Sequence, residues 1–164
     1  MDPRDLEGYR RLDTRAEARA ELDRIVSRAQ RSLRIADDRG EFYGFERRAF
    51  AQALEALLGR GPERTVEIIL HDPAFVEQRC PRLVALVRRY APRLRILRSE
   101  ESVRGFSRGF VLADDTVVLR RPHYDSTIAF VDFDEQAVAQ ARELLDELAA
   151  GATVAIGASV TGLS

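Results

Sequence analysis

Hydrophobic side chains recur at the three- and four-residue spacing of an amphipathic helix in four stretches of the chain. These stretches cover residues 14–31, 45–58, 81–91 and 134–150. The first begins at Thr14, with a glutamate three residues later at the spacing of a capping box. The last begins at an aspartate and ends before a glycine, which are common helix boundaries. The pattern therefore predicts four helices with defined ends.

Six short runs of β-branched and aliphatic residues predict strands. They cover residues 33–36, 66–70, 94–97, 109–113, 116–119 and 127–131. The residues Asp114-Asp115 form a tight connection between the fourth and fifth runs, which is typical of an antiparallel hairpin. Strands that alternate with helices imply parallel crossovers, whereas the later consecutive strands imply an antiparallel extension. The predicted fold class is α/β, with a mixed β-sheet flanked by helices.

The length of 164 residues fits one domain, which we expect to cover residues 14–150. Residues 1–13 form an arginine-rich N-terminal lead-in. Residues 151–164 form a small, apolar C-terminal tail that pairs at a sheet edge, docks elsewhere or stays mobile.

The composition excludes several kinds of chemistry. All 26 basic residues are arginine, which excludes Schiff-base chemistry and a phosphate-loop lysine. Cys80 is the only cysteine, which excludes an internal disulfide and a zinc site built on several thiolates. The chain has no apolar run of about 18 residues and begins with charged residues, so we expect no membrane span, no secretory signal and a cytoplasmic protein.

Two segments resemble the phospholipase D-like superfamily. Residues 65–73 read TVEIILHDP and are similar to a strand of that family, whereas residues 107–119 read SRGFVLADDTVVL and match the register of its HxKxxxxD strand and hairpin. The resemblance covers about residues 14–148 and implies a phospholipase D-like sandwich. In that family the motif's His attacks phosphorus, its Lys binds phosphate oxygens and its Asp orients the His.

The three motif positions hold Ser107, Gly109 and Asp114 in this chain. A serine without a neighbouring base is a poor nucleophile, and glycine supplies no cation. The resemblance therefore implies a degenerate, single-motif member without phosphodiesterase activity, and we assign no catalytic residue and no cofactor. Similar degenerate domains occur in bacteria, sometimes beside an acetyltransferase domain, which implies an accessory module.

Arginines flank the degenerate strand and the end of its hairpin partner, and we expect Arg108 and Arg120 to point toward one edge. Because guanidinium groups suit phosphate, one interpretation is a residual anion-binding site where the family binds its substrate phosphate. The other is that an arginine-rich chain scatters arginines, each neutralised by one of 27 carboxylates. The candidate residues are Ser107, Arg108, Asp114, Arg120, Arg121 and His123, with Arg104 nearby.

The two histidines offer an alternative, in which His71 or His123 acts with Asp114 in a rebuilt phosphodiesterase site. His71 ends the second predicted strand, where a parallel sheet presents its ligand edge, and His123 follows the hairpin. Their ordinary roles are a polar strand cap and an exposed loop residue. Neither has the spacing of a metal-binding pair, so we assign no metal site.

Acidic residues stand in two connections at the strand ends. Residues 37–39 and 41–43 follow the first strand, and we expect a solvated loop there, with the lining of a pocket as the alternative. In the hairpin connection we expect the carboxylate of Asp114 to accept N–H groups from Asp115 or Thr116.

The leading interpretation is a non-catalytic phospholipase D-like binding or assembly module. Family members bring two motifs together within one chain or by dimerisation, so a single motif implies a homodimer or a partner protein. Nucleic-acid binding through the arginines is a third interpretation, which the isoelectric point near 6.2 weakens. We expect no membrane partner.

Overall fold

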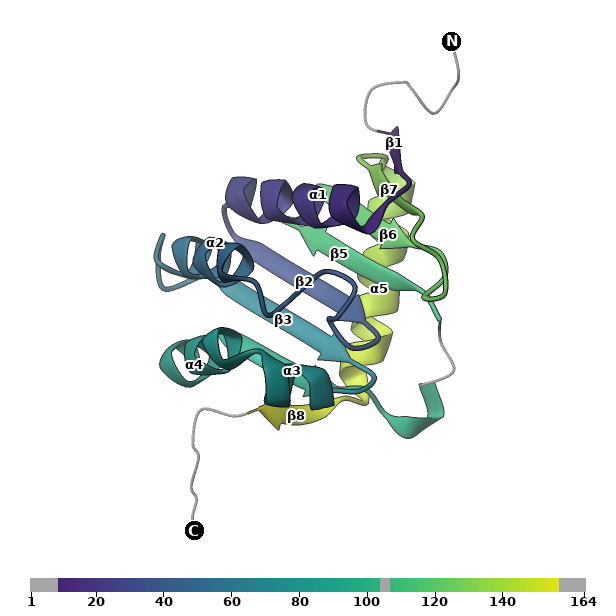
Figure 1. The fold of residues 1–164 in the computed structure, drawn as a ribbon. Coiled ribbons are helices and arrows are strands. Elements are labelled where there is room, and N and C mark those ends of the chain that lie inside the picture. The colour runs from purple at the N-terminus through teal and green to yellow at the C-terminus, as the bar shows by residue number, and fades with distance from the viewer. Residues whose placement is uncertain (1–8, 104–106, 157–164) are drawn as a thin grey trace.

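The computed structural model describes residues 9–103 and 107–156, which form an eight-stranded mixed sheet with helices on both faces (Figure 1). The strand order is β1-β7-β6-β5-β2-β3-β4-β8. The strands are β1 (Tyr9–Leu12), β2 (Ser32–Asp37), β3 (Thr65–Leu70), β4 (Leu94–Arg98), β5 (Gly109–Ala113), β6 (Val117–Arg121), β7 (Ala129–Asp132) and β8 (Thr153–Ile156). The helices are α1 (Arg15–Arg28), α2 (Arg48–Leu58), α3 (Ala74–Arg79), α4 (Pro81–Tyr90) and α5 (Glu135–Ala150), with a 3-10 turn, η2 (Glu101–Val103), after β4.

The centre of the sheet is parallel. β2 pairs with β3 and β3 pairs with β4 in parallel register, and the connections run through α2 and then through α3 and α4. β5 pairs with β2 in antiparallel register, and β6 and β7 continue the antiparallel half. The carboxyl ends of β2, β3 and β4 therefore share one edge of the sheet with the start of β5 and the end of β6.

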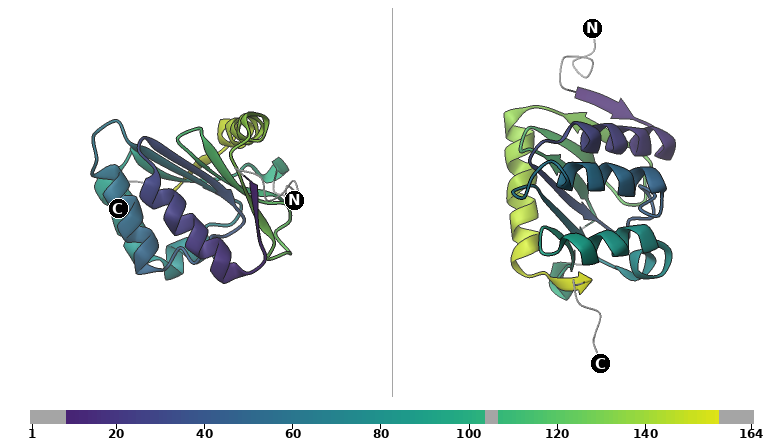
Figure 2. Two further views of the ribbon diagram at one scale, coloured as in Figure 1. Left: turned by 90° about the horizontal axis from the view of Figure 1, so that it is seen from above. Right: turned by 90° about the vertical axis from the view of Figure 1, so that its left-hand side faces the viewer.

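Helices cover the two faces of the sheet unequally (Figure 2). α1, α2 and α4 pack on one face and bury the larger core, which includes Ile35, Phe50 and Val111. α5 alone covers the other face and packs on a smaller core that includes Phe110 and Leu112. Because side chains alternate along a strand, odd-numbered positions of β5 face α1 and α2, and even-numbered positions face α5.

The structure confirms the predicted α/β class with a mixed sheet, and it confirms the hairpin. Asp114 and Asp115 have φ angles of 54° and 57°, which is the left-handed pair that a two-residue hairpin turn needs. β5 and β6 pair in register on either side of this turn.

Two elements, β1 and α3, differ from the prediction, and the structure decides between the alternatives for part of the C-terminal tail. Tyr9–Leu12, within the expected lead-in, forms β1 and pairs with β7, and Arg10 ties it to Glu21 of α1. The predicted C-terminal tail contains β8, which pairs with β4. Of the three alternatives given for the tail, residues 153–156 therefore follow the first, pairing at a sheet edge. The six-residue helix α3 is too short to produce a helical period that stands out in the sequence. In the described ranges, no helix has both the length and the apolar character that crossing a membrane requires.

Candidate functional site

The edge at which β2, β3, β4 and β6 end is the expected place for a ligand, because open α/β sheets bind ligands beyond the carboxyl ends of their strands. β5 runs in the opposite direction and begins here with Gly109, the position that the resemblance aligns with the lysine of the phospholipase D-like motif. The segment that resembles this motif therefore starts at this edge and ends with Asp114, just after β5.

Gly109 has little free space around it. A Cβ atom at this position would lie 3.1 Å from the carbonyl oxygen of Ala36, 3.1 Å from Cε1 of Tyr124 and 3.5 Å from Oδ1 of Asp37. The first two distances are shorter than ordinary van der Waals contacts. A side chain at this position would therefore meet the Ala36 carbonyl and the Tyr124 ring closely and would be in ordinary contact with the carboxylate of Asp37.

Arg121 places a cation beside Gly109. It lies opposite Gly109 in the pairing of β5 with β6, so both positions share the face toward α1 and α2. Its Nη1 lies 3.1 Å from Oδ1 of Asp37, and its Nη2 donates a hydrogen bond of 2.7 Å to the carbonyl of Tyr124. The side chains of Arg121 and Asp37 are only 4% and 1% exposed, so this is a buried ion pair that neutralises the cation.

The second oxygen of Asp37 is also occupied. Oδ2 accepts the backbone N–H of Gly40 at 2.8 Å, and Gly40 has a positive φ of 83° that brings its amide back over the strand end. Burial raises the pKa of Asp37, while the charge of Arg121 and the Gly40 amide act in the opposite direction. Both carboxylate oxygens thus have partners within the protein.

Two aromatic rings enclose the Arg121 guanidinium. Its Cζ lies 3.6 Å from the ring centroid of Phe42 and 5.3 Å from that of Tyr124, so both contacts are cation–π contacts. The hydroxyl of Tyr124 donates a 2.8 Å hydrogen bond to the carbonyl of Arg108. Burial, followed by the nearby Asp37 carboxylate, raises the pKa of Tyr124, which keeps the phenol protonated as a donor.

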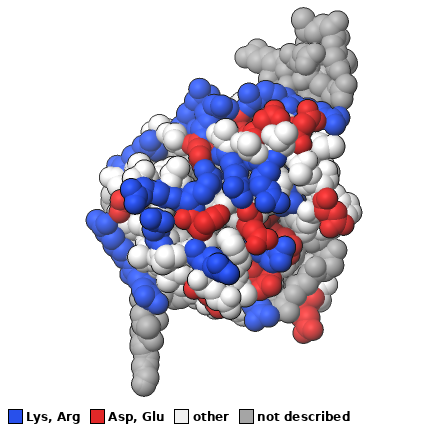
Figure 3. All heavy atoms as spheres, viewed as in Figure 1, with Lys and Arg blue, Asp and Glu red and all other residues white. Residues whose placement is uncertain are grey.

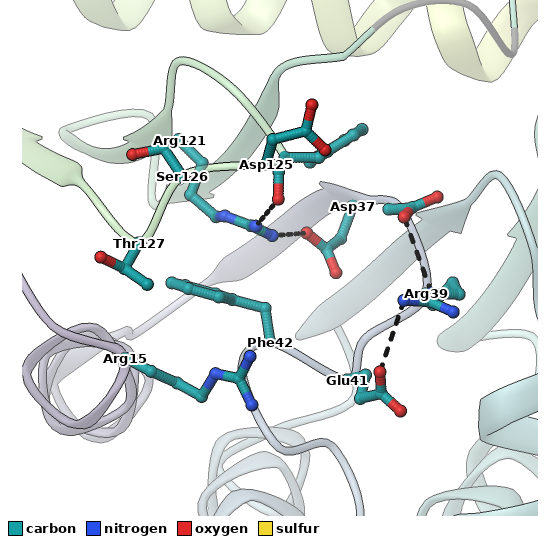
Figure 4. A pocket seen from close by; sticks show the side chains of 11 residues that line it. Arg15, Asp37, Arg39, Glu41, Phe42, Arg121, Asp125, Ser126 and Thr127 are labelled. Atoms are coloured by element: carbon teal, nitrogen blue, oxygen red, sulfur yellow. Dashed lines mark hydrogen bonds and ion pairs between the residues drawn. The ribbon is translucent and has the colours of Figure 1, made fainter.

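A cavity of about 130 Å³ opens beside this ion pair (Figure 4). Its wall carries charges of both signs, because Arg15 and Arg39 stand among several carboxylates. Arg39 bridges two of them, with contacts of 3.7 Å to Asp38 and 3.4 Å to Glu41. Residues of the loop after β2 therefore line a pocket, which is the alternative that the sequence analysis gave for them.

A larger groove, of about 450 Å³, lies on the opposite face, between the β5–β6 hairpin and the start of α5. Arg108 and Arg120 line it together, so the expectation that they share one edge is confirmed. We call it the α5 groove, and its lining residues are Arg108, Phe110, Arg120, Arg121, Pro122, Asp132, Asp134, Gln136, Ala137 and Gln140.

Asp114 lies away from both of these cavities, which are at the carboxyl edge of the sheet. Its carboxylate accepts three backbone N–H groups that precede or begin β2, those of Gln30 at 2.8 Å, Arg31 at 2.7 Å and Ser32 at 3.0 Å. Burial acts to raise the pKa of Asp114, but these hydrogen bonds outweigh it and hold the pKa below its usual 3.8. The prediction that Asp115 or Thr116 supplies the N–H groups was wrong.

The structure does not bring Asp114 together with either histidine. β2 spans the distance between them, since Ser32 bonds to Asp114 and Asp37 bonds to the backbone of His71. Six strand residues separate these contacts by about 16 Å. The rebuilt phosphodiesterase site that pairs Asp114 with His71 or His123 therefore lacks its geometry.

Comparison with solved structures gives the fold. TrmBL2, described as an archaeal chromatin protein with a novel mode of DNA binding, superposes with a TM-score of 0.68 at 14% identity, over 90% of this chain and 54% of that one. NucT from Helicobacter pylori gives 0.63 at 15% identity, over 89% of this chain and 99% of that one. Nuc from Salmonella typhimurium, a phospholipase D family member, gives 0.62 at 12% identity, over 89% and 97%. The fold is the predicted phospholipase D-like sandwich, and the chain spans about half the length of TrmBL2.

A family model described as a domain of unknown function, DUF7931, matches residues 14–150. The chain belongs to the DUF7931 family. A search of curated proteins finds no match for it.

The remaining candidates of this DUF7931 chain are spread around the edge. Ser107 accepts the backbone N–H of Tyr124 through its carbonyl, at 2.9 Å. His123 is 59% exposed, and its Nδ1 lies 3.7 Å from Oδ2 of Asp125. Arg104 lies outside the described residues. Ser107 and His123 line neither cavity, so the α5 groove brings together only Arg108, Arg120 and Arg121 of the six candidates.

His71 is buried at the end of β3. Its Nδ1 lies 2.6 Å from Oγ of Ser99, which is 1% exposed, and its ring meets that of Tyr124 edge to face at a centroid distance of 5.9 Å. Both side chains of this pair are therefore buried. In the described ranges, no cluster of three or more His, Cys, Asp or Glu side chains is arranged to hold a metal ion.

Sequence reasoning missed Tyr124 altogether and gave Asp37 as part of a solvated loop, with the lining of a pocket as the alternative. Asp37 had one usable signal, since it directly follows a buried parallel strand at the ligand edge. Tyr124 had none, because it stands in a polar loop three residues after β6. Its importance depends on the glycine at position 109, which leaves room for the ring.

Proposed function

We propose that this chain is a non-catalytic, degenerate phospholipase D-like module that binds a phosphate-class anion in the α5 groove. The non-catalytic part rests on one observation: at Gly109, the position that the resemblance aligns with the family's lysine, a Cβ atom would lie 3.1 Å from both the Ala36 carbonyl and the Tyr124 ring. Arg121, a cation opposite that position, is neutralised by a carboxylate of the same protein. A substrate phosphate at this place would have to displace Asp37 from a buried ion pair, which is strongly unfavourable.

The charges of the α5 groove support an anion there. Its two acidic side chains face the helix end: Oδ2 of Asp134 accepts the N–H groups of Gln136 and Ala137, at 3.1 and 3.2 Å, and Asp132 accepts the N–H of Asp134 at 2.9 Å. Arg108 and Arg120 supply the guanidinium forks that match phosphate oxygens.

The stacking of Arg120 on Phe130 supports the same site. Its Cζ lies 4.6 Å from the ring centroid, which fixes the guanidinium on the wall of the groove. Gln136 and Gln140 add side-chain amides that can donate to an anion. Because position 109 faces the other side of the sheet, this site is separate from the one that the family uses.

Two measurements test the proposal. Assays with bis(p-nitrophenyl) phosphate are expected to give no turnover, and turnover that disappears in His71→Ala would overturn the non-catalytic part. Titration calorimetry with inorganic pyrophosphate is expected to show binding that the Arg108→Gln/Arg120→Gln double variant loses. Arg142→Gln is the matched control, because Arg142 is an exposed arginine of α5 outside the groove. Equal binding by the double variant would overturn the anion site.

A short DNA duplex serves as a third arm of the titration. Nucleic-acid affinity falls steeply with salt, because phosphate contacts release counterions. Duplex binding with such a salt slope, in the absence of pyrophosphate binding, would replace the anion site by the nucleic-acid function.

We also propose that the module works as a homodimer or with a partner protein. This part rests on the way in which members of the phospholipase D-like superfamily bring two motifs together, within one chain or by dimerisation. Light scattering is expected to give the mass of a dimer, and a monomeric mass over a wide concentration range, without a partner, would contradict the homodimer.

A further inference from the structure

The four helices of eight or more residues begin in two different ways. α1 and α5 begin with side-chain caps, Thr14 and Asp134, and each carries a glutamate in its first turn. α2 and α4 have no side-chain cap and no acidic residue in the first turn. Their first turns instead contain Arg48 and Arg82.

An arginine in the first turn of a helix is placed against the helix dipole, because the amino end already carries partial positive charge. Both Arg48 and Arg82 are exposed. Neither guanidinium forms an ion pair or a hydrogen bond with any part of the chain that the structure describes. α2 and α4 both follow parallel strands, so their amino ends lie at the same end of the helical layer (Figure 1). Two positive charges without an ion-pair partner among the described residues therefore stand at the helix ends where the helix dipole disfavours them.

These two arginines belong to one groove. It runs between α2 and α4, has a volume of about 410 Å³, and is lined by the buried Ala51 and Leu86 and by the exposed Ala85. We call it the α2–α4 groove. Its small residues let another helix approach closely, and its floor offers a narrow apolar stripe.

The positive charge that has no ion-pair partner within this groove is concentrated at one end. Near the carboxyl ends of the helices, Arg89 donates to Glu55 across the groove at 2.7 Å, so that end is neutralised. Arg48 and Arg82 at the opposite end have no such partner. Figure 3 shows arginine side chains predominating on the side of this face where α2 and α4 lie.

We infer that the α2–α4 groove docks an acidic amphipathic helix of a partner protein. The apolar stripe of that helix lies on Ala51 and Leu86, and its carboxylates lie at the end that carries Arg48 and Arg82. Departures from local sequence rules are expected at functional sites, and two helices that share the same departure beside one groove fit that expectation. The partner's carboxylates supply the negative charge that the first turns of both helices lack.

This inference goes beyond the proposed function and does not depend on it. The α2–α4 groove and the α5 groove lie on opposite faces of the sheet, so variants of one leave the other intact.

A binding experiment tests the docking site with a defined probe. The probe is a synthetic, fluorescently labelled amphipathic helix with an alanine–leucine stripe flanked by glutamates, and its control has lysine in place of every glutamate. Fluorescence anisotropy is expected to show binding of the glutamate peptide only, with affinity at least tenfold weaker for the Arg48→Gln/Arg82→Gln variant. Arg88→Gln is the matched control, since Arg88 is an exposed arginine of α4 outside the groove, and it should bind as the wild type does.

Several outcomes would overturn the inference. One is equal binding by the double variant, and another is equal or tighter binding of the lysine peptide. If only a labelled DNA duplex binds and the double variant loses it, the groove serves nucleic acid. If the wild type self-associates in sedimentation and the double variant does not, the occupant is a second copy of the chain.

A stability measurement gives an independent readout. Charge reversal in Arg48→Glu and Arg82→Glu is expected to raise the melting temperature of the free protein by about 1–4 °C each, because each replaces an unfavourable first-turn charge by a favourable one. The same variants should abolish binding of the glutamate peptide. A fall in melting temperature on both reversals would contradict the premise that these arginines are retained against local stability.

Discussion

The two ends of β5 bound the segment that resembles the HxKxxxxD motif, and they differ in what surrounds them. At the hairpin end, Asp114 remains, and its carboxylate ties three amides around the start of β2. At the carboxyl edge, the position that the resemblance aligns with the lysine of the phospholipase D-like motif is Gly109, whose nearest neighbours are the Ala36 carbonyl and the Tyr124 ring. The hairpin end thus holds a carboxylate with a structural role, whereas a side chain at position 109 would meet close neighbours. The carboxylate of Asp114 therefore has a structural explanation without any reaction.

The two ends of β5 also differ in how the charged side chains beside them are stabilised. Asp114 is partly exposed, and neutral amides stabilise its negative charge. Asp37 and Arg121 are almost fully buried and neutralise one another. A buried pair stabilises little in net terms, but the loss of one partner leaves a charge stranded in the interior. We therefore expect the loss of one partner of the buried Asp37–Arg121 pair to cost more than the loss of the Asp114 carboxylate.

The largest effect is expected for Arg121→Met, which leaves the carboxylate of Asp37 buried without its cation. The free energy of unfolding should fall by about 3–5 kcal/mol, measured by urea denaturation. The double variant Asp37→Leu/Arg121→Met is the control, because the removal of both charges should recover most of the loss. A double variant as unstable as the single one would mean that the packing of Arg121 on Phe42, and not the ion pair, holds this end.

The second effect tests the hairpin end. Asp114→Ala removes the acceptor of three N–H groups and places alanine at a φ of 54°, so unfolding free energy should fall by about 2 kcal/mol. Asp114→Asn tolerates the left-handed backbone and keeps one acceptor oxygen, so it should lose about half as much. Equal losses in both variants would show that the negative charge, not the acceptor geometry, is what matters.

The depressed pKa of Asp114 adds a pH dependence with a definite sign. A carboxyl whose pKa is lower in the folded state contributes stability above its unfolded pKa, and this stability disappears as the pH falls through the folded value. The wild type should therefore lose stability as the pH falls below the usual 3.8. Asp114→Asn should show a smaller acid loss in denaturation curves recorded from neutral pH downward, and an unchanged slope would contradict the assignment.

The comparison also explains what the sequence could reveal. The central strands, the hairpin and the capped helices follow from local periodicity and turn chemistry, which are complete within a few residues. β1 was not predicted because its arginine-rich sequence lacks the alternation of apolar and polar residues that marks a strand. It is held in place by Glu21 and by pairing with β7, which lies more than a hundred residues away in the chain.

The site was harder to predict because its contacts join distant parts of the chain. Asp37 meets Arg121 across 84 residues, so its local surroundings gave the pattern of a solvated loop. Asp114 meets its amide partners across 82 to 84 residues, and for that reason the expected turn bonds were the wrong ones. The absence of His and Lys from the motif was visible in the sequence, but the filling of their place was not.

The third effect probes the closed position itself. In Gly109→Ala, the new methyl group would lie 3.1 Å from both the Ala36 carbonyl and the Tyr124 ring. The carbonyl belongs to the sheet and cannot move away freely, so we expect a loss of about 1–2 kcal/mol in thermal or urea unfolding. Ala36→Gly is not a useful control, because the contact is with backbone; Ala113→Gly tests instead how this strand tolerates a change of one methyl at its other end. A neutral or stabilising Gly109→Ala would mean that the position is open, and it would weaken the argument against a lysine there.

The smallest effect concerns the hydroxyl of Tyr124, which donates to the carbonyl of Arg108 at 2.8 Å. Tyr124→Phe keeps the ring that fills the space beside Gly109 and contacts the Arg121 guanidinium, and it removes only this bond. The cost should be about 1 kcal/mol, the usual net value of one hydrogen bond. Tyr124→Ala removes the ring as well, so it should cost clearly more, and the difference between the two variants measures the packing alone.

Two double variants test whether the Tyr124 ring limits the space at Gly109. Gly109→Ala/Tyr124→Phe keeps the ring, so its loss of stability should equal the sum of the two single losses. Gly109→Ala/Tyr124→Ala should lose less than the sum of its single losses, because the missing ring makes room for the methyl group. Additive losses in the second pair would show that the Ala36 carbonyl, and not Tyr124, sets the limit at Gly109.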